Sequence, residues 1–128
     1  MIHCIPTSNG EILDKLSILL IKKDQTLDTQ QLININNEIN HIKNIADSVI
    51  AINNKLIIKN SDLKNINKKL WDIEDKIRNK EKLKQFDQEF IDLARKVYIY
   101  NDIRAKIKKE INKLSNSLIT EEKIYDEY

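Results

Sequence analysis

Two neighbouring segments of the chain have charged and amide side chains at positions that helical spacing assigns to the apolar face of a helix. In the first segment, Glu74, Arg78 and Glu81 are spaced four and three residues apart along one edge of an apolar helical stripe. In the second segment, Asn101 and Arg104 fall within a broad apolar stripe. An unpaired buried carboxylate or guanidinium is costly. We therefore expect these five side chains to form one hydrogen-bonded group between two facing helices.

The sequence leaves three interpretations of this group open. It is a buried salt-bridge network that fixes the helix register, a ligand or catalytic site, or a solvated edge of the bundle. As a site, its two arginines would favour a small anionic ligand that bears phosphate or carboxylate. No catalytic role is assigned, and no metal or cofactor is predicted, because the His3–Cys4 pair has no second His/Cys cluster. The candidate ligand-binding residues are Trp71, Glu74, Arg78, Glu81, Arg95, Tyr98, Asn101, Asp102 and Arg104.

The composition predicts an all-α fold. The chain has 128 residues, and its single proline (Pro6) and single glycine (Gly10) both lie within the first ten. From Glu11 onward, no residue marks a strand boundary or a tight turn. We expect one helical domain over residues 1–128, a small bundle built on a long antiparallel hairpin. Residues 1–7 form a short strand or an extended arm.

Capping residues predict where the helices begin. Ser8 and Glu11 fit a capping box, with the serine as N-cap. Residues 53–60 either continue a helix or form a loop that docks on the core. The first expected helix begins after Ser8 and ends at 24–26, and the second begins after Asp28 or Thr29 and reaches Ile52. The third covers 62–83 with Ser61 as its cap, and the fourth covers 88–114 with Asp87 as its cap. A last short helix is expected after Thr120.

The second expected helix has a narrow apolar stripe that resembles a coiled-coil seam. Apolar residues repeat at spacings of three and four from Leu32 to Ile52, and the positions between them are polar. A monomer of this size would have difficulty covering such a seam. The sequence therefore predicts a homo-oligomer, most simply a dimer formed through this helix, or binding to another protein.

Charge and hydropathy narrow the range of partners. There are 22 basic and 20 acidic residues, so nothing suggests a nucleic-acid or anionic-membrane surface. No apolar run approaches the roughly 20 residues of a membrane span. The first ten residues lack the basic and apolar regions of a signal peptide, and the single Cys fits a reducing compartment. We expect a cytoplasmic protein.

Four segments of the chain resemble a family of bacterial and phage proteins of unknown function, DUF6165. They are GEILDKLSILLIKK from Gly10, LWDIEDKIRNKE from Leu70, FDQEFIDLARKVYIYNDIRAKIKKEIN from Phe86 and SLITEEKIY from Ser117. The resemblance implies a helical fold and an occasional association with glycosyltransferases or tetratricopeptide proteins in surface-polysaccharide contexts. It implies no activity. The residues that it emphasises are Trp71, Glu74, Asp75, Arg78, Glu81, Asp87, Arg95, Tyr98, Asn101, Asp102, Arg104, Lys106, Glu121, Glu122 and Lys123.

Two functions from different classes fit these observations. The first is a non-catalytic helical module for interaction or assembly, accessory to surface-polysaccharide glycosylation if the family context applies. The balanced charge and the absence of a phosphate loop, an HExxH motif or a metal-spaced Cys–His pair support it. The second is an enzyme or binder for a small anionic ligand, with its polar site inside the bundle. A sealed network would favour the first, and an open cleft the second.

Overall fold

The computed structural model describes residues 1–128 and contains four helices and no strand. The all-α prediction is therefore confirmed. Residues 1–7 form an arm without regular structure, and residues 118–128 form a C-terminal tail that also lacks helix and strand. The helices are α1 (Asn9–Gln25), α2 (Thr29–Ile50), α3 (Lys55–Lys82) and α4 (Gln88–Leu114).

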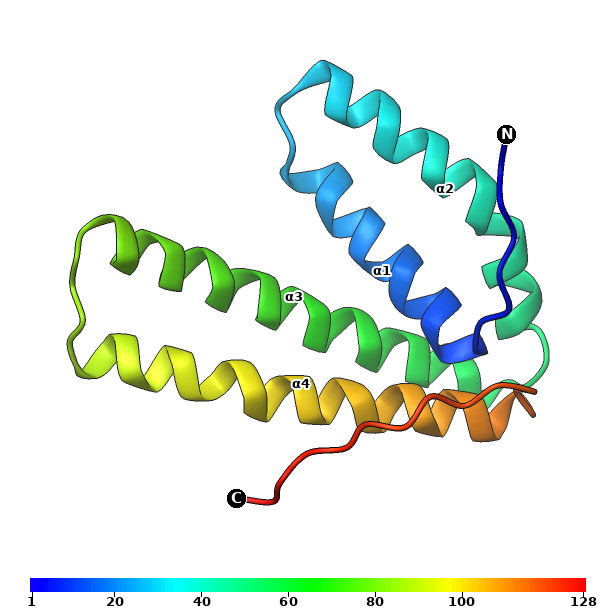
Figure 1. Cartoon of the computed structure of the whole chain (residues 1–128). Helices are drawn as coiled ribbons and strands as arrows, with labels where there is room; N and C mark the ends of the chain where they lie inside the picture. Colours follow the sequence, from blue (N-terminus) through cyan, green and yellow to red (C-terminus); the bar gives the residue numbers. More distant parts are fainter.

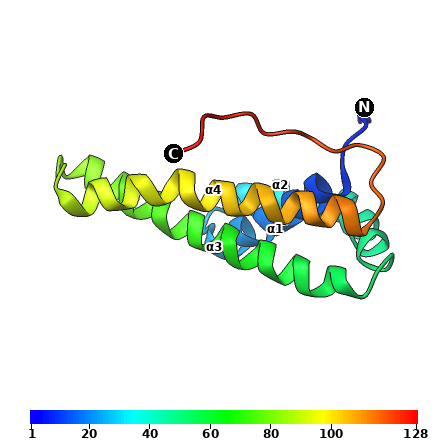
Figure 2. The same cartoon turned by 90° about the horizontal axis from the view of Figure 1, so that it is seen from below.

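The helices form two antiparallel hairpins that cross near one end of the molecule (Figure 1). α3 and α4 lie side by side along their length, as the predicted long hairpin requires. The shorter α1–α2 hairpin packs mainly through α1, which contacts both α3 and α4. The two hairpins diverge from this junction, so the far end of the α3–α4 hairpin projects beyond the rest of the chain (Figures 1 and 2).

The hydrophobic core lies where the four helices meet. Every helix contributes to it, and four of its residues (Ala46, Leu56, Leu63 and Ile111) are completely inaccessible to solvent. Burial of such a leucine or isoleucine side chain stabilises the folded chain by about 1.5–3 kcal/mol. The core residues are Leu13, Ala46, Val49, Leu56, Leu63, Ile66 and Ile111.

Three predicted N-caps are confirmed. The Ser8 hydroxyl accepts a hydrogen bond from the backbone N–H of Glu11 at 3.1 Å. Asp28 and Asp87 cap α2 and α4 in the same way, at 2.8 and 3.0 Å. These side chains satisfy N–H groups that a helix leaves without a partner.

Two predicted boundaries are wrong. α3 begins at Lys55 rather than after Ser61, because the buried side chain of Leu56 ties this segment to the core. The last short helix after Thr120 does not form. Isolated helices of a few residues are marginal in water, and the tail is bound by side-chain contacts instead.

The apolar seam of α2 is used largely within the chain. Ala46 and Val49 pack with Leu13 of α1, and Ile39 is also buried. The surface that motivated a dimer through this helix is therefore mostly covered by α1. Ile45 and Ile52 remain about half exposed. Self-association stays a prediction, and none of the four helices has an apolar stretch long enough to span a membrane.

Candidate functional site

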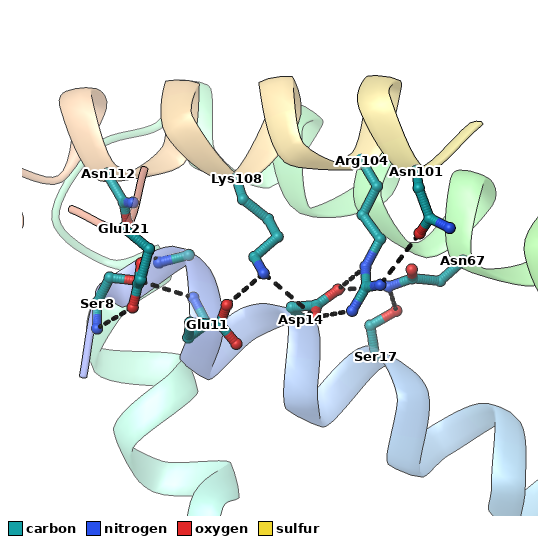
Figure 3. A network of polar contacts seen from close by, with 11 residues as sticks. Ser8, Glu11, Asp14, Ser17, Asn67, Asn101, Arg104, Lys108, Asn112 and Glu121 are labelled. Atoms are coloured by element: carbon teal, nitrogen blue, oxygen red, sulfur yellow. Dashed lines mark hydrogen bonds and ion pairs between the residues drawn. The ribbon is translucent and has the colours of Figure 1, made fainter. Parts of the chain in front are cut away.

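Polar side chains gather where α1 crosses α3 and α4 (Figure 3). Glu11, Asp14 and Ser17 are spaced three residues apart along one face of α1. α4 presents a facing row that contains Arg104 and Lys108, four residues apart. We call this cluster the junction network. Its members are Glu11, Asp14, Ser17, Asn67, Asn101, Arg104 and Lys108.

Asp14 is the centre of the junction network. Its side chain is only 4% exposed. The guanidinium of Arg104 donates to both carboxylate oxygens, with Nε at 2.9 Å from Oδ1 and the Nη2 contact on Oδ2. Asn67 of α3 donates its Nδ2 to Oδ1 at 2.9 Å and also bonds the Ser17 hydroxyl at 3.2 Å. One carboxylate thus joins three helices by a bidentate, charge-assisted contact and an amide.

The charges of the network balance within the chain. Lys108 forms an ion pair with Glu11, and its Nζ lies 3.7 Å from Oδ2 of Asp14. Arg104 also donates through Nη1 to Oδ1 of Asn101 at 3.4 Å. Two cations therefore face two carboxylates. Every buried side-chain nitrogen or oxygen in the molecule has a hydrogen-bond partner.

The pKa of Asp14 reflects two opposing effects, its burial and its contacts with positively charged and amide groups. Burial raises the pKa of this carboxyl, but the hydrogen bonds from Arg104 and Asn67 and the charges of Arg104 and Lys108 lower it by more. The net pKa lies below its usual value. The hydrogen bond to Asp14 likewise raises the pKa of Arg104. Both groups are thus held in their charged forms.

The N-terminus of α1 is closed by residues from the other end of the chain. The backbone N–H of Gly10 donates to Oδ1 of Asn112 at 2.7 Å, and that of Asn9 to the Ser117 hydroxyl at 3.1 Å. The N–H of Ser8 donates to Glu121 of the tail at 3.3 Å. Glu121 thus takes the place that the predicted capping box gives to Glu11, which pairs with Lys108 instead.

Only a glycine fits where α1 meets α4. A Cβ atom on Gly10 would lie 2.7 Å from the backbone oxygen of Lys108 and 2.9 Å from Oδ1 of Asn112. The single glycine of the body of the chain therefore sets how closely the two hairpins approach.

The prediction that Glu74, Arg78 and Glu81 join Asn101 and Arg104 in one group is wrong. The first three are exposed, and the only ion pair among them joins Glu81 to the neighbouring Lys84. The reason is the path of α1, which diverges from the α3–α4 hairpin before it reaches these residues (Figure 1). No other helix covers that flank, so the charges stay in solvent.

The structure divides the predicted site residues among three places. Asn101 and Arg104 lie in the junction network. Tyr98 and Asp102 contact the tail through Tyr128, which stacks edge-on against Tyr98 and donates its hydroxyl to Asp102. The remaining candidates lie on the outer part of the α3–α4 hairpin, where Trp71 is half-buried and the others are exposed: Trp71, Glu74, Arg78, Glu81 and Arg95.

The sequence analysis did not select Asp14 and Asn67, although the position of each on its helix indicates that it is buried. Asn67 lies on the apolar stripe of α3, between Leu63 and Leu70. Asp14 shares a face of α1 with the apolar residues Ile18 and Ile21, which favours burial of that face. A buried amide and a buried acid on such faces require partners. Their pairing with Arg104 depends on which helices cross, and helical spacing alone does not determine that.

These features define a small all-α protein in which two crossed hairpins are joined by a buried charge network. The chain belongs to the family of unknown function DUF6165, whose model matches residues 4–128. The family resemblance noted from the sequence is thus confirmed. No curated protein and no solved structure matches the chain.

Proposed function

We propose that this protein is a non-catalytic helical interaction module that self-associates through the projecting end of its long hairpin. We call residues 76–92 the hairpin end. The observation that supports this proposal is its exposed apolar surface: Leu83, Phe86 and Ile91 are 55%, 56% and 48% exposed. Apolar side chains grouped at an element that projects from the body are typical of a protein interface.

The hairpin end is preformed, which favours binding. Lys80, whose side chain is only 13% exposed, bonds both Asp87 and Glu89 across the turn, at 2.9 and 3.0 Å. Phe86 packs edge-on against Phe90, with the ring centroids 5.3 Å apart. Because the turn is already ordered, little conformational entropy is lost when it binds.

The charges of the hairpin end suit a second copy of the chain. Residues 76–84, on the α3 side, include five basic residues and one acidic residue. Residues 85–92, on the α4 side, include three acidic residues and no basic one. A two-fold interface places the same patch on both partners. The basic side of one copy would then face the acidic side of the other.

The non-catalytic part of the proposal is supported by the junction network. Its cations and carboxylates bond one another, so an anionic substrate would have to displace Asp14 from Arg104. The expectation that such a module assists surface-polysaccharide glycosylation comes from the family resemblance and belongs to the same proposal.

The proposal is tested by sedimentation velocity over a concentration series. We expect the mass of the wild-type chain to rise from 15.1 kDa towards twice that value at tens of micromolar. Phe86→Ser should shift the dimer dissociation constant upward by tenfold or more, because burial of a phenylalanine contributes about 1.5–3 kcal/mol.

Ile33→Ser is the matched control, because Ile33 is also 56% exposed but lies on α2. It should leave the association unchanged, and circular dichroism should show both variants folded. A wild-type chain that stays at 15.1 kDa at all concentrations would contradict the proposal. So would an equal loss of association in the two variants.

A further inference from the structure

The tail is an extended segment that lies along α4. It leaves the end of α4 and runs back beside that helix (Figures 1 and 2). Two ion pairs and one hydrogen bond attach it to α4. They join Lys109 to Glu122 at 3.0 Å, Lys123 to Asp102 at 3.0 Å, and the Tyr128 hydroxyl to Asp102 at 2.7 Å.

The α4 residues that receive the tail form one stripe. Tyr98, Asp102 and Lys109 are separated by four and seven residues, so they lie on one face of the helix. We call this face the tail stripe. Tyr128 and Tyr98 have ring centroids 5.1 Å apart in an edge-on arrangement. The stripe thus already binds an extended segment by charge and by aromatic contact.

The attachment of the tail is weak for its length. Lys109 and Glu122 are each more than 60% exposed, and exposed ion pairs contribute little. Leu118 and Ile124 of the tail do not pack on α4, since both side chains are almost fully exposed. What favours the bound tail is mainly its covalent tether, which keeps its local concentration high.

The tail also leaves space beneath it. A cavity of about 820 Å³ lies between the tail and α4. Ile99 and Ile103 supply apolar lining, Tyr125 lies on the tail side, and Ile103 remains 42% exposed. Lys106 lines the same cavity and forms no ion pair. The groove thus has unfilled space beside apolar side chains and one lysine, Lys106, that no carboxylate of the tail pairs with.

We propose that the tail stripe is a docking surface for an extended acidic segment of a partner protein, and that the tail occupies it when the partner is absent. A carboxylate of that segment pairs with Lys109, and a second one with Lys106. A hydroxyl or ammonium group bonds Asp102, as Tyr128 and Lys123 do within the chain. An aromatic side chain enters the cavity beside Ile99 and Ile103.

The test uses the full-length chain and a fluorescein-labelled peptide that copies the tail, LITEEKIYDEY. The double variant Lys123→Glu with Tyr128→Ser releases the tail but leaves α4 intact. Fluorescence anisotropy should show the peptide bound about tenfold more tightly to this variant than to the wild type, because a tethered competitor acts at millimolar effective concentration. A second peptide, with tryptophan in place of the tyrosine copied from Tyr125, should bind more tightly still.

The control adds Lys109→Glu to the released variant, which should weaken peptide binding severalfold because the new glutamate repels the acidic peptide, while the exposed Lys96→Glu should leave it unchanged. No binding to a released variant that circular dichroism shows to be folded would overturn the proposal. Binding that Lys109→Glu does not weaken would overturn it as well. A wild-type dimer that Lys109→Glu converts to a monomer would overturn it in favour of tail exchange between two copies.

Discussion

Arg104 is paired with an acid that sequence spacing did not suggest. The glutamates of α3 share the expected phase, but they lie on a flank that no helix covers. Asp14 is buried, so its attraction to the guanidinium is screened little by water. At the residue scale, burial rather than position along the helix therefore determines which acid Arg104 binds. The geometry favours the salt-bridge interpretation of the network, and ligand binding by the other predicted residues stays a prediction.

The first prediction concerns the charge of Asp14. Asp14→Asn should lower the free energy of unfolding by about 3 kcal/mol at neutral pH, because it leaves a half-buried guanidinium without its counter-charge. The loss lies at the low end of the range for a broken buried ion pair, because the Arg104 side chain keeps 27% of its surface exposed to water. Urea unfolding at unchanged slope measures the difference.

The difference in unfolding free energy between the wild type and Asp14→Asn should also depend on pH. Folding lowers the pKa of Asp14 below its usual 3.8. The stabilisation is therefore complete above about pH 5 and is lost as the pH falls through the folded-state pKa. The gap between wild type and Asp14→Asn should narrow below that point. Asp75→Asn removes an exposed carboxylate of α3 and should change stability by less than about 0.5 kcal/mol. An equal loss in both variants, or a gap that does not depend on pH, would show that Asp14 does not have this role.

At the scale of single elements, α1 depends on contacts with α4 at its first turn. Gly10→Ala should destabilise the protein, because the new methyl group would lie 2.7 Å from a backbone oxygen that cannot move freely. Overpacking of this kind costs about 1–3 kcal/mol. Thermal unfolding followed by circular dichroism provides the measurement, and Asn9→Ala is the neighbouring control, which removes only one hydrogen bond to Ser115. A variant as stable as the wild type would mean that α1 can move away from α4 at little cost.

The helix starts were predictable where one local signal determines them. Ser8, Asp28 and Asp87 each cap a helix because a short polar side chain reaches the free N–H groups three residues on. The start of α3 was not predictable in this way. Ser61 has the same local signal, but the helix begins six residues earlier, at Lys55, and its first turn carries the buried core residue Leu56.

The arrangement of the whole molecule is set by where α1 packs on the long α3–α4 hairpin, and the sequence does not show this. Helical spacing predicted the α3–α4 pair, because both helices are long and joined by a short turn. It did not predict that α1 would cover only one part of that pair. Arg104 is consequently half-buried and paired, whereas Arg78 is exposed to solvent.

This arrangement also distributes stability unevenly along the long hairpin. The core residues of α3 and α4 lie between Leu56 and Ile66 and at Ile111, next to the junction network. Leu70, Ile73 and Leu93 extend the burial a short way, but no residue from 74 to 92 is buried. Segments with few buried apolar contacts open more easily than the rest of a protein. The hairpin end should therefore be the first part of the α3–α4 pair to unfold.

Native-state hydrogen exchange tests this last prediction. At low micromolar concentration, amides of residues 76–82 and 91–92 should exchange on the order of 100-fold faster than those of residues 60–67 and 104–111, because they can open without disrupting the core. Raising the protein concentration should slow exchange at the hairpin end alone if copies associate there, and Phe86→Ser should remove that slowing. Uniform protection along α3 and α4 at every concentration would mean that the hairpin opens as one unit with the core, and the prediction would then be wrong.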